Sequence, residues 1–206
     1  MRLLVATRSP GKQGEITRLL AGSGLEIGFP EDANVWESPV ELGLEVHDSF
    51  QGNARAKAEY FARAAGLPTV ADDSGLEVFS LGGEPGVRSR RWAGITGPEA
   101  AGVAANNALL LRRLAGAPAA KRRARYRCVL VLLRKATGIP EVFDFACGGT
   151  ITTEPHGEGG FGYDPYFSSD DLGKTFGEAT DAEKDAVSHR GRAVRALLAA
   201  LVARPL

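Results

Sequence analysis

Short apolar runs alternate with longer amphipathic stretches along the chain, a pattern that predicts strands mixed with helices. Residues 3–6 form an apolar run typical of a buried strand, and residues 15–20 have helical spacing. Residues 50–65, FQGNARAKAEYFARAA, are rich in helix formers, and Gly66 ends the pattern. The first third of the chain is therefore expected to run strand, helix, helix.

The remaining elements continue this mixture. We expect strands at 69–71 and 76–81, a helix from Pro98 through Leu114, a hairpin of 125–133 with 141–145, and a last helix at 193–203. Alternating strands and helices combined with a hairpin predict an α/β fold on a mixed sheet. A chain of 206 residues, 44% hydrophobic, can bury one substantial core, so a single domain over residues 1–206 is expected.

Charge and cysteine content narrow the function classes. The 25 basic and 25 acidic residues balance, so the total charge gives no reason to expect a nucleic-acid or membrane partner. Cys128 and Cys147 lie in apolar surroundings without metal-ligand spacing and read as core residues of a reduced compartment. The N-terminal apolar run is too short for a signal or a membrane span, and we expect a cytoplasmic protein.

The densest basic run, KRRARYR at 121–127, is a pattern found in nucleic-acid binders. It leads directly into the apolar residues 128–133. We interpret it as a solvated loop and the start of a strand.

Thr7, Arg8, Ser9, Pro10, Gly11 and Lys12 follow a predicted strand and open a helix. Backbone N–H groups and the helix dipole at such a position favour a phosphate, and a lysine adds charge. The Walker A spacing is absent, and a simple capped turn is the alternative.

Asp72 and Asp73 stand where a strand is expected to end, the usual place of a ligand crevice in an α/β sheet. Adjacent carboxylates repel each other, and a Mg²⁺ ion would relieve that repulsion. One of them could also orient or deprotonate water. A turn capped by one aspartate is the alternative.

Two further segments carry candidate binding groups. In the glycine-rich stretch 157–165, Phe161 and Tyr163 offer ring faces for a base, Gly162 permits close approach, and Asp164 offers an acceptor. Residues 184–191 lead into the last helix, and they hold three candidate anion- or base-binding groups: Lys184, His189 and Arg190.

Five motifs together carry a family resemblance. TRSPGK at 7–12, ADDSG at 71–75, GGEPGVRSRRWAG at 82–94, GGFGYDP at 159–165 and SHRG at 188–191 resemble, in order and spacing, the inosine triphosphate pyrophosphatase family. The resemblance implies a long twisted mixed β-sheet flanked by helices, two lobes with a central active-site cleft, and a homodimer.

The resemblance also implies roles for single residues. Asp73 matches the catalytic carboxylate, which binds Mg²⁺ and accepts a proton, and Glu45 is the implied metal partner. Lys57 falls where the family's helix offers a lysine to phosphate, and His189 and Arg190 fall in the base-reading loop. The segment around Glu45 departs from the family pattern at His47 and Ser49, and Glu41 is a rival ligand. Ser9 stands where the family commonly has asparagine, so the contact of this side chain with phosphate or base differs. The backbone N–H groups of residues 7–12 and Lys12 are retained.

The expected function is hydrolysis of ITP, dITP or XTP to the monophosphate and pyrophosphate. Glu45 and Asp73 would hold Mg²⁺, three lysines (12, 57 and 184) would neutralise phosphate, and Ser74 would complete the cradle. A Maf-type pyrophosphatase and a non-catalytic nucleotide or RNA binder are the alternatives.

Overall fold

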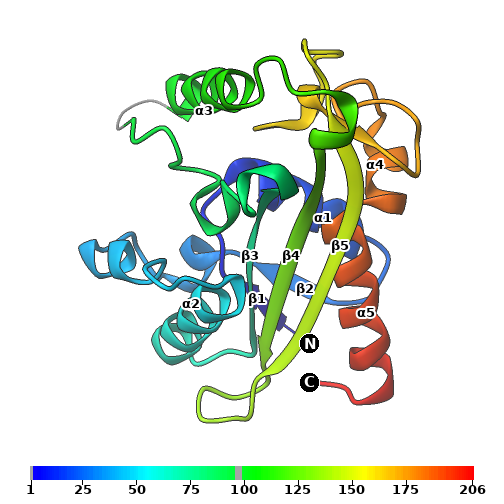
Figure 1. The fold of residues 1–206 in the computed structure, drawn as a ribbon. Coiled ribbons are helices and arrows are strands. Elements are labelled where there is room, and N and C mark those ends of the chain that lie inside the picture. Colours follow the sequence, from blue (N-terminus) through cyan, green and yellow to red (C-terminus); the bar gives the residue numbers. More distant parts are fainter. Residues whose placement is uncertain (1, 96–98) are drawn as a thin grey trace. The chain divides into compact units, whose positions relative to one another are not determined.

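Six strands form one mixed sheet in the described part of the chain, residues 2–95 and 99–206 of this computed structural model, in the order β2-β1-β3-β4-β5-β6 (Figure 1). β1 (Arg2–Val5) pairs in parallel with β2 (Glu26–Gly28) and β3 (Thr69–Val78), whereas β5 (Glu141–Ile151) pairs antiparallel with β6 (Phe167–Ser169). β4 (Arg123–Leu133) lies between β3 and β5. The predicted α/β fold on a mixed sheet is confirmed.

Of the helices in the described residues, three lie between strands in the sequence and two follow the last strand. They are α1 (Pro10–Leu20), α2 (Phe50–Ala65), α3 (Glu99–Arg113), α4 (Asp181–Val187) and α5 (His189–Ala203). Within those same residues, no helix is both long and apolar enough to span a membrane.

Contacts divide the chain into two compact units. The first unit consists of residues 1–73, 128–145 and 190–206, and the second of residues 74–127 and 146–189. β3, β4 and β5 each contribute residues to both units. The expectation of a single domain stays a prediction.

The first unit buries α1 and α5 against the sheet. Its core contains Leu3 and Val5 of β1, Ile16 of α1, Leu130 of β4 and Leu197 of α5. α2 lies on the other side of the sheet (Figure 1). The sheet of this unit is thus covered on both faces, as expected for its parallel strands.

The second unit has its own core. Its members come from β3, α3, β4, β5 and the segment around β6: Leu76, Val78, Leu110, Leu114, Ala124, Tyr126, Cys147, Ile151, Tyr163, Phe167 and Phe176. Cys128 and Cys147 are both buried free thiols, as the sequence predicts.

Local signals explain why α2 has the predicted bounds. The Ser49 side chain caps the first turn by accepting from the Gly52 N–H at 3.1 Å. Gly66 ends the helix in the left-handed region at φ +66°, where its N–H bonds to the Ala62 carbonyl.

Several expectations about element boundaries were wrong or fall outside the described residues. α1 begins at Pro10 rather than at 15, and β5 runs to Ile151 rather than to 145. The residues expected as two strands with a break at the aspartates form one continuous strand, β3, and residues 79–81 form a 3-10 turn. The last helix begins at His189 rather than at 193, so the segment expected as a loop is helical. Pro98, the expected start of α3, lies outside the described residues.

The cap of α2 gives a stability prediction. Gly66→Ala places a Cβ in the left-handed region and should lower the free energy of unfolding by about 1 kcal/mol. Gly102→Ala is the matched control, because Gly102 lies within α3 with open space at its Cβ position, and it should raise stability by up to about 1 kcal/mol. Urea unfolding of both variants measures the two effects, and equal shifts would contradict the cap.

Candidate active site

The loop between β1 and α1 presents the start of a helix. Pro10 occupies the first turn, and Ser9 is the N-cap residue in an extended conformation. The Thr7 hydroxyl accepts from the Ser9 N–H at 3.3 Å. Lys12 lies within the first turn of α1 and pairs with Asp72 at 3.1 Å between Nζ and Oδ2.

Arg8, in the same loop, forms ion pairs with two glutamates. Its Nε and Nη2 donate to the two oxygens of Glu41 at 2.7 Å each, and it also pairs with Glu31. These carboxylates raise the pKa of Arg8 against the effect of burial, its hydrogen bond to Glu41 having the largest effect. Glu41, the rival metal ligand, is thus held by a guanidinium.

Asp72 belongs to a buried cluster of charges. Arg190, in the first turn of α5, pairs with Asp72 at 3.3 Å and with Glu15 of α1, and all three side chains are almost completely buried. Burial raises the pKa of Asp72, but the charges of Lys12, Arg190 and Lys57 outweigh it and hold that pKa well below its usual range. Asp72 is therefore a permanent anion that neutralises two cations.

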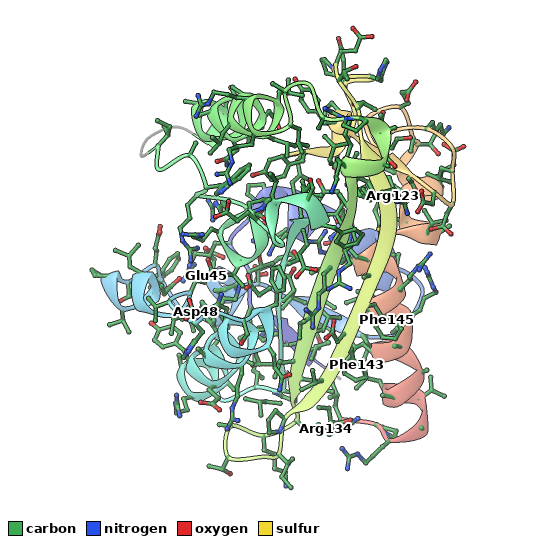
Figure 2. The ribbon with its side chains drawn as sticks, viewed as in Figure 1. Glu45, Asp48, Arg123, Arg134, Phe143 and Phe145 are labelled. Carbon is green, nitrogen blue, oxygen red and sulfur yellow. The ribbon has the colours of Figure 1, made fainter. Side chains whose placement is uncertain are left out.

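Asp73 has different neighbours. Asn53 of α2 donates to its Oδ2 at 2.9 Å, and Lys57, one turn further along α2, lies 3.6 Å from its Oδ1. Glu45, which is labelled in Figure 2, comes from the segment before α2. It accepts from the same Lys57 ammonium at 2.6 Å. Two carboxylates thus converge on one cation.

Burial has the largest effect on the pKa values of both Asp73 and Lys57. It raises the pKa of Asp73, with Glu45 adding to the shift and Lys57 and Lys12 opposing it. Burial lowers the pKa of Lys57, but Glu45 and the two aspartates outweigh it and raise that pKa above its usual value. Asp73 is thus a stronger proton acceptor than an exposed aspartate, beside a fully charged lysine.

The alternation of side chains along a strand explains why the adjacent Asp72 and Asp73 have different neighbours and opposite pKa shifts. Successive side chains of β3 point to opposite faces of the sheet. Asp72 faces α1 and α5, whereas Asp73 faces α2. The sequence suggested that the two carboxylates repel each other because they are adjacent. Since they lie on opposite faces, each is instead governed by its own neighbours.

The glycine-rich loop of the second unit is built around Asp164. The Phe161 N–H donates to Asp164 Oδ2 at 2.7 Å, and Lys184 of α4 donates to the same oxygen at 2.6 Å. The Lys184 ammonium also lies 4.8 Å from the Phe161 ring centroid. Of the two rings in the loop, Phe161 is 38% exposed, whereas Tyr163 is only 5% exposed.

His189 begins α5 as a buried residue. Its ring stacks on Tyr126 with 4.8 Å between centroids and an interplanar angle of 8°. Its Nδ1 lies 4.0 Å from the Cys147 sulfur. Burial, reinforced by Asp164, raises the pKa of Tyr126 well above its usual value, so the phenol stays neutral beside this ring.

The arginines of the basic run have protein partners. Arg122 is buried and donates to the carbonyls of Leu114, Ile151 and Thr152. Arg123 pairs with Asp170 at 2.6 Å, and Arg125 with Glu77 at 2.5 Å. Most of the basic run belongs to β4, and its exposed arginines form ion pairs at the surface. This agrees with our interpretation of the run as a loop and the start of a strand.

The residues present fit a divalent cation that also binds phosphate. Among residues 2–95 and 99–206, no group of three or more His, Cys, Asp or Glu side chains is arranged as a metal site. Mg²⁺ commonly uses one or two carboxylates and completes its coordination with water and substrate phosphates. Glu45 and Asp73, which converge on one ammonium, supply that number of carboxylates.

Two residues of this site were missed from the sequence. Glu15 pairs with a residue 175 positions away, and nothing local signals that contact. Asn53 lies in the segment that resembles the family pattern, and its amide both donates to Asp73 and accepts from the His47 N–H at 2.9 Å. The buried face of α2, which holds Asn53 and Lys57 four residues apart, could have indicated it.

Comparisons with known proteins agree on one family. The sequence model of the Ham1 family matches residues 3–200. A relative from Nocardia farcinica, named dITP/XTP pyrophosphatase, is 46% identical over 98% of this chain and 95% of its own. A relative of the same name from Ralstonia nicotianae is 44% identical over 96% of this chain and 94% of its own.

Solved structures agree with this result. A HAM1 protein from Coxiella burnetii is similar with a TM-score of 0.85 and 31% identity, over 98% of this chain and 99% of that one. A nucleoside-triphosphatase or dITP/XTP pyrophosphatase from Mycobacterium abscessus has a TM-score of 0.73 and 42% identity, over 96% of this chain and 99% of that one.

The buried charge cluster gives a stability prediction. Arg190→Ala leaves Glu15 and Asp72 buried without this cation and should lower the free energy of unfolding by about 3–5 kcal/mol. Arg204→Ala, which removes an exposed ion pair with Glu141, should cost at most about 1 kcal/mol. Chemical denaturation of both proteins checks the difference, and similar losses would contradict the role of burial.

Proposed function

The chain belongs to the Ham1 family, and on that basis we propose that it hydrolyses non-canonical purine nucleoside triphosphates such as ITP, dITP and XTP. Water adds across the α–β phosphoanhydride, and the products are the nucleoside monophosphate and pyrophosphate. The observation that carries the proposal is the convergence of Glu45 and Asp73 on Lys57. The names of the relatives support the choice of substrate.

Glu45 and Asp73 are the proposed holders of a catalytic Mg²⁺ ion. When bound, such an ion supplies neutralisation of the triphosphate and a lowered pKa of coordinated water. Asp73 is also the proposed acceptor of the proton of the attacking water. Asn53 keeps the carboxylate oriented for this transfer through its bond to Oδ2.

The first unit also supplies the cations that bind phosphate. Lys12 lies in the first turn of α1, and Lys57 is fully charged between two carboxylates. Charge on the leaving pyrophosphate is stabilised by these ammonium groups together with the N–H groups at the start of α1. Ser74, the residue after Asp73, completes the proposed phosphate contacts.

The contacts with the base are assigned to the glycine-rich loop and to the start of α5. The exposed ring of Phe161 stacks on the purine, while Lys184 and Asp164 hold that ring in place. His189 remains a proposed base-reading residue. Arg190 donates to Glu15 and Asp72, so we assign it first to the charge cluster that supports Lys12.

A homodimer in the cytoplasm, without nucleic-acid or membrane partners, completes the proposal. The paired arginines of residues 121–127 support the absence of a nucleic-acid surface there. Measuring the molecular mass in solution tests the dimer.

Pyrophosphate release from ITP with Mg²⁺ tests the reaction. The wild-type protein should release pyrophosphate, and Asp73→Asn should lower kcat by about 10²–10⁴-fold with little change in Tm, because the amide removes the base and a metal ligand. Asp72→Asn should instead lower Tm, since it removes the anion between Lys12 and Arg190. Release of orthophosphate alone, or an active Asp73→Asn variant, would refute the proposal.

The base contact is tested by removing the exposed ring. Phe161→Ala should raise KM for ITP and XTP alike, by a factor equivalent to about 1–3 kcal/mol, because stacking does not depend on the identity of the base. Phe79→Ala is the control, since Phe79 is an exposed ring over Arg125 elsewhere in the second unit. Steady-state kinetics with both nucleotides measure the effect. An unchanged KM would show that Phe161 does not contact the base.

A further inference from the structure

Ser89 joins three segments of the second unit. Its hydroxyl donates to the Gly86 carbonyl at 2.6 Å and accepts from the Leu76 N–H at 2.9 Å. Its own carbonyl accepts from the Tyr163 hydroxyl at 2.8 Å. The second half of β3, the turn at 86–94 and the glycine-rich loop therefore meet at one residue.

The close approach of these segments is built into the sequence. A Cβ at Gly75 would lie 2.3 Å from the Ser89 hydroxyl oxygen and 2.5 Å from the Gly86 carbonyl oxygen. Only glycine at position 75 leaves room for the Ser89 side chain to reach the strand. Because burial raises the pKa of Tyr163, its phenol stays protonated and remains a donor.

Two adjacent asparagines of α3 brace the same junction. Asn106 donates to the carbonyls of Ser89 and Arg90 and accepts from the Ala93 N–H at 2.8 Å. Asn107 donates to the Gly162 carbonyl at 3.0 Å. The turn at 86–94 and the glycine-rich loop are thus held by the same helix as well as by each other.

We propose that Ser89 is a positioning residue that fastens the strand segment following Asp73 to the loop that carries Phe161. It acts through other residues and needs no contact with the substrate. Its hydroxyl fixes the backbone at Leu76, three residues after Asp73, and its carbonyl fixes Tyr163, two residues after Phe161. The link to catalysis rests on the proposed function, whereas the fastening itself does not.

Two of the hydrogen bonds of Ser89, those with the strand and with the glycine-rich loop, predict different kinetic effects. Ser89→Ala removes the bond to the strand and should lower kcat roughly ten-fold or more, because small misplacements of a site cost rate steeply. Tyr163→Phe removes the bond to the loop and should mainly raise KM. Because both bonds act through residue 89, the double variant should lose less than the product of the single losses.

Ser80→Ala is the matched control. The Ser80 hydroxyl also donates to a backbone carbonyl in the second unit, that of Lys121 at 2.5 Å, and this bond joins neither of the two segments. Its kcat and KM should equal those of the wild type. A Ser89→Ala variant that behaves like Ser80→Ala, or losses in the double variant that multiply as independent effects, would overturn the positioning role.

Amide hydrogen exchange separates this inference from the proposed function. Ser89→Ala should speed exchange in residues 74–78 and Tyr163→Phe in residues 160–166, and Ser80→Ala in neither. Unchanged exchange in both segments overturns the fastening whatever the activity. A wild-type protein that releases no pyrophosphate from ITP refutes the proposed function, and faster exchange in Ser89→Ala would still support the fastening.

Discussion

The alternation of side chains along β3 is the constraint on which the candidate site depends. It sends Asp72 into a cluster with Lys12 and Arg190 and Asp73 towards Asn53 and Lys57. Each carboxylate therefore meets its own cations, and the two take opposite shifts in pKa, downward for Asp72 and upward for Asp73. One strand thus carries a permanent anion, Asp72, and a carboxylate with a raised pKa, Asp73, which is the proposed proton acceptor.

The helices of the first unit supply different partners to the two aspartates. α1 and α5 bring Lys12, Glu15 and Arg190 to one face of the first unit, where burial makes each charge depend on the others. α2 brings an amide and an ammonium to the other face at a spacing of one helical turn. Regular elements rather than flexible loops position these groups, which favours a preorganised site.

Elements with local signals could be predicted from the sequence. α2 was predicted with its observed bounds, since helix formers fill it and Gly66 ends it in the left-handed region. β3 was divided in two because Ser74 and Gly75 favour a turn in isolation, whereas pairing within the sheet keeps them extended. The start of α5 was placed four residues late, as His189 and Arg190 carry no helical pattern of their own. The ion pair of Glu15 with Arg190 depends on tertiary packing and has no local signal.

The period of two residues in β3 also limits how this segment can change in evolution. Inserting or deleting one residue between the pairing of Val70 with Val5 and the aspartates would exchange the surroundings of the two carboxylates. Asp73, the proposed proton acceptor, would then leave the face of α2, and Asp72 would face α2 in its place. Substitutions at the neighbouring positions therefore leave the two carboxylates on their own faces, whereas a change of one residue in length does not.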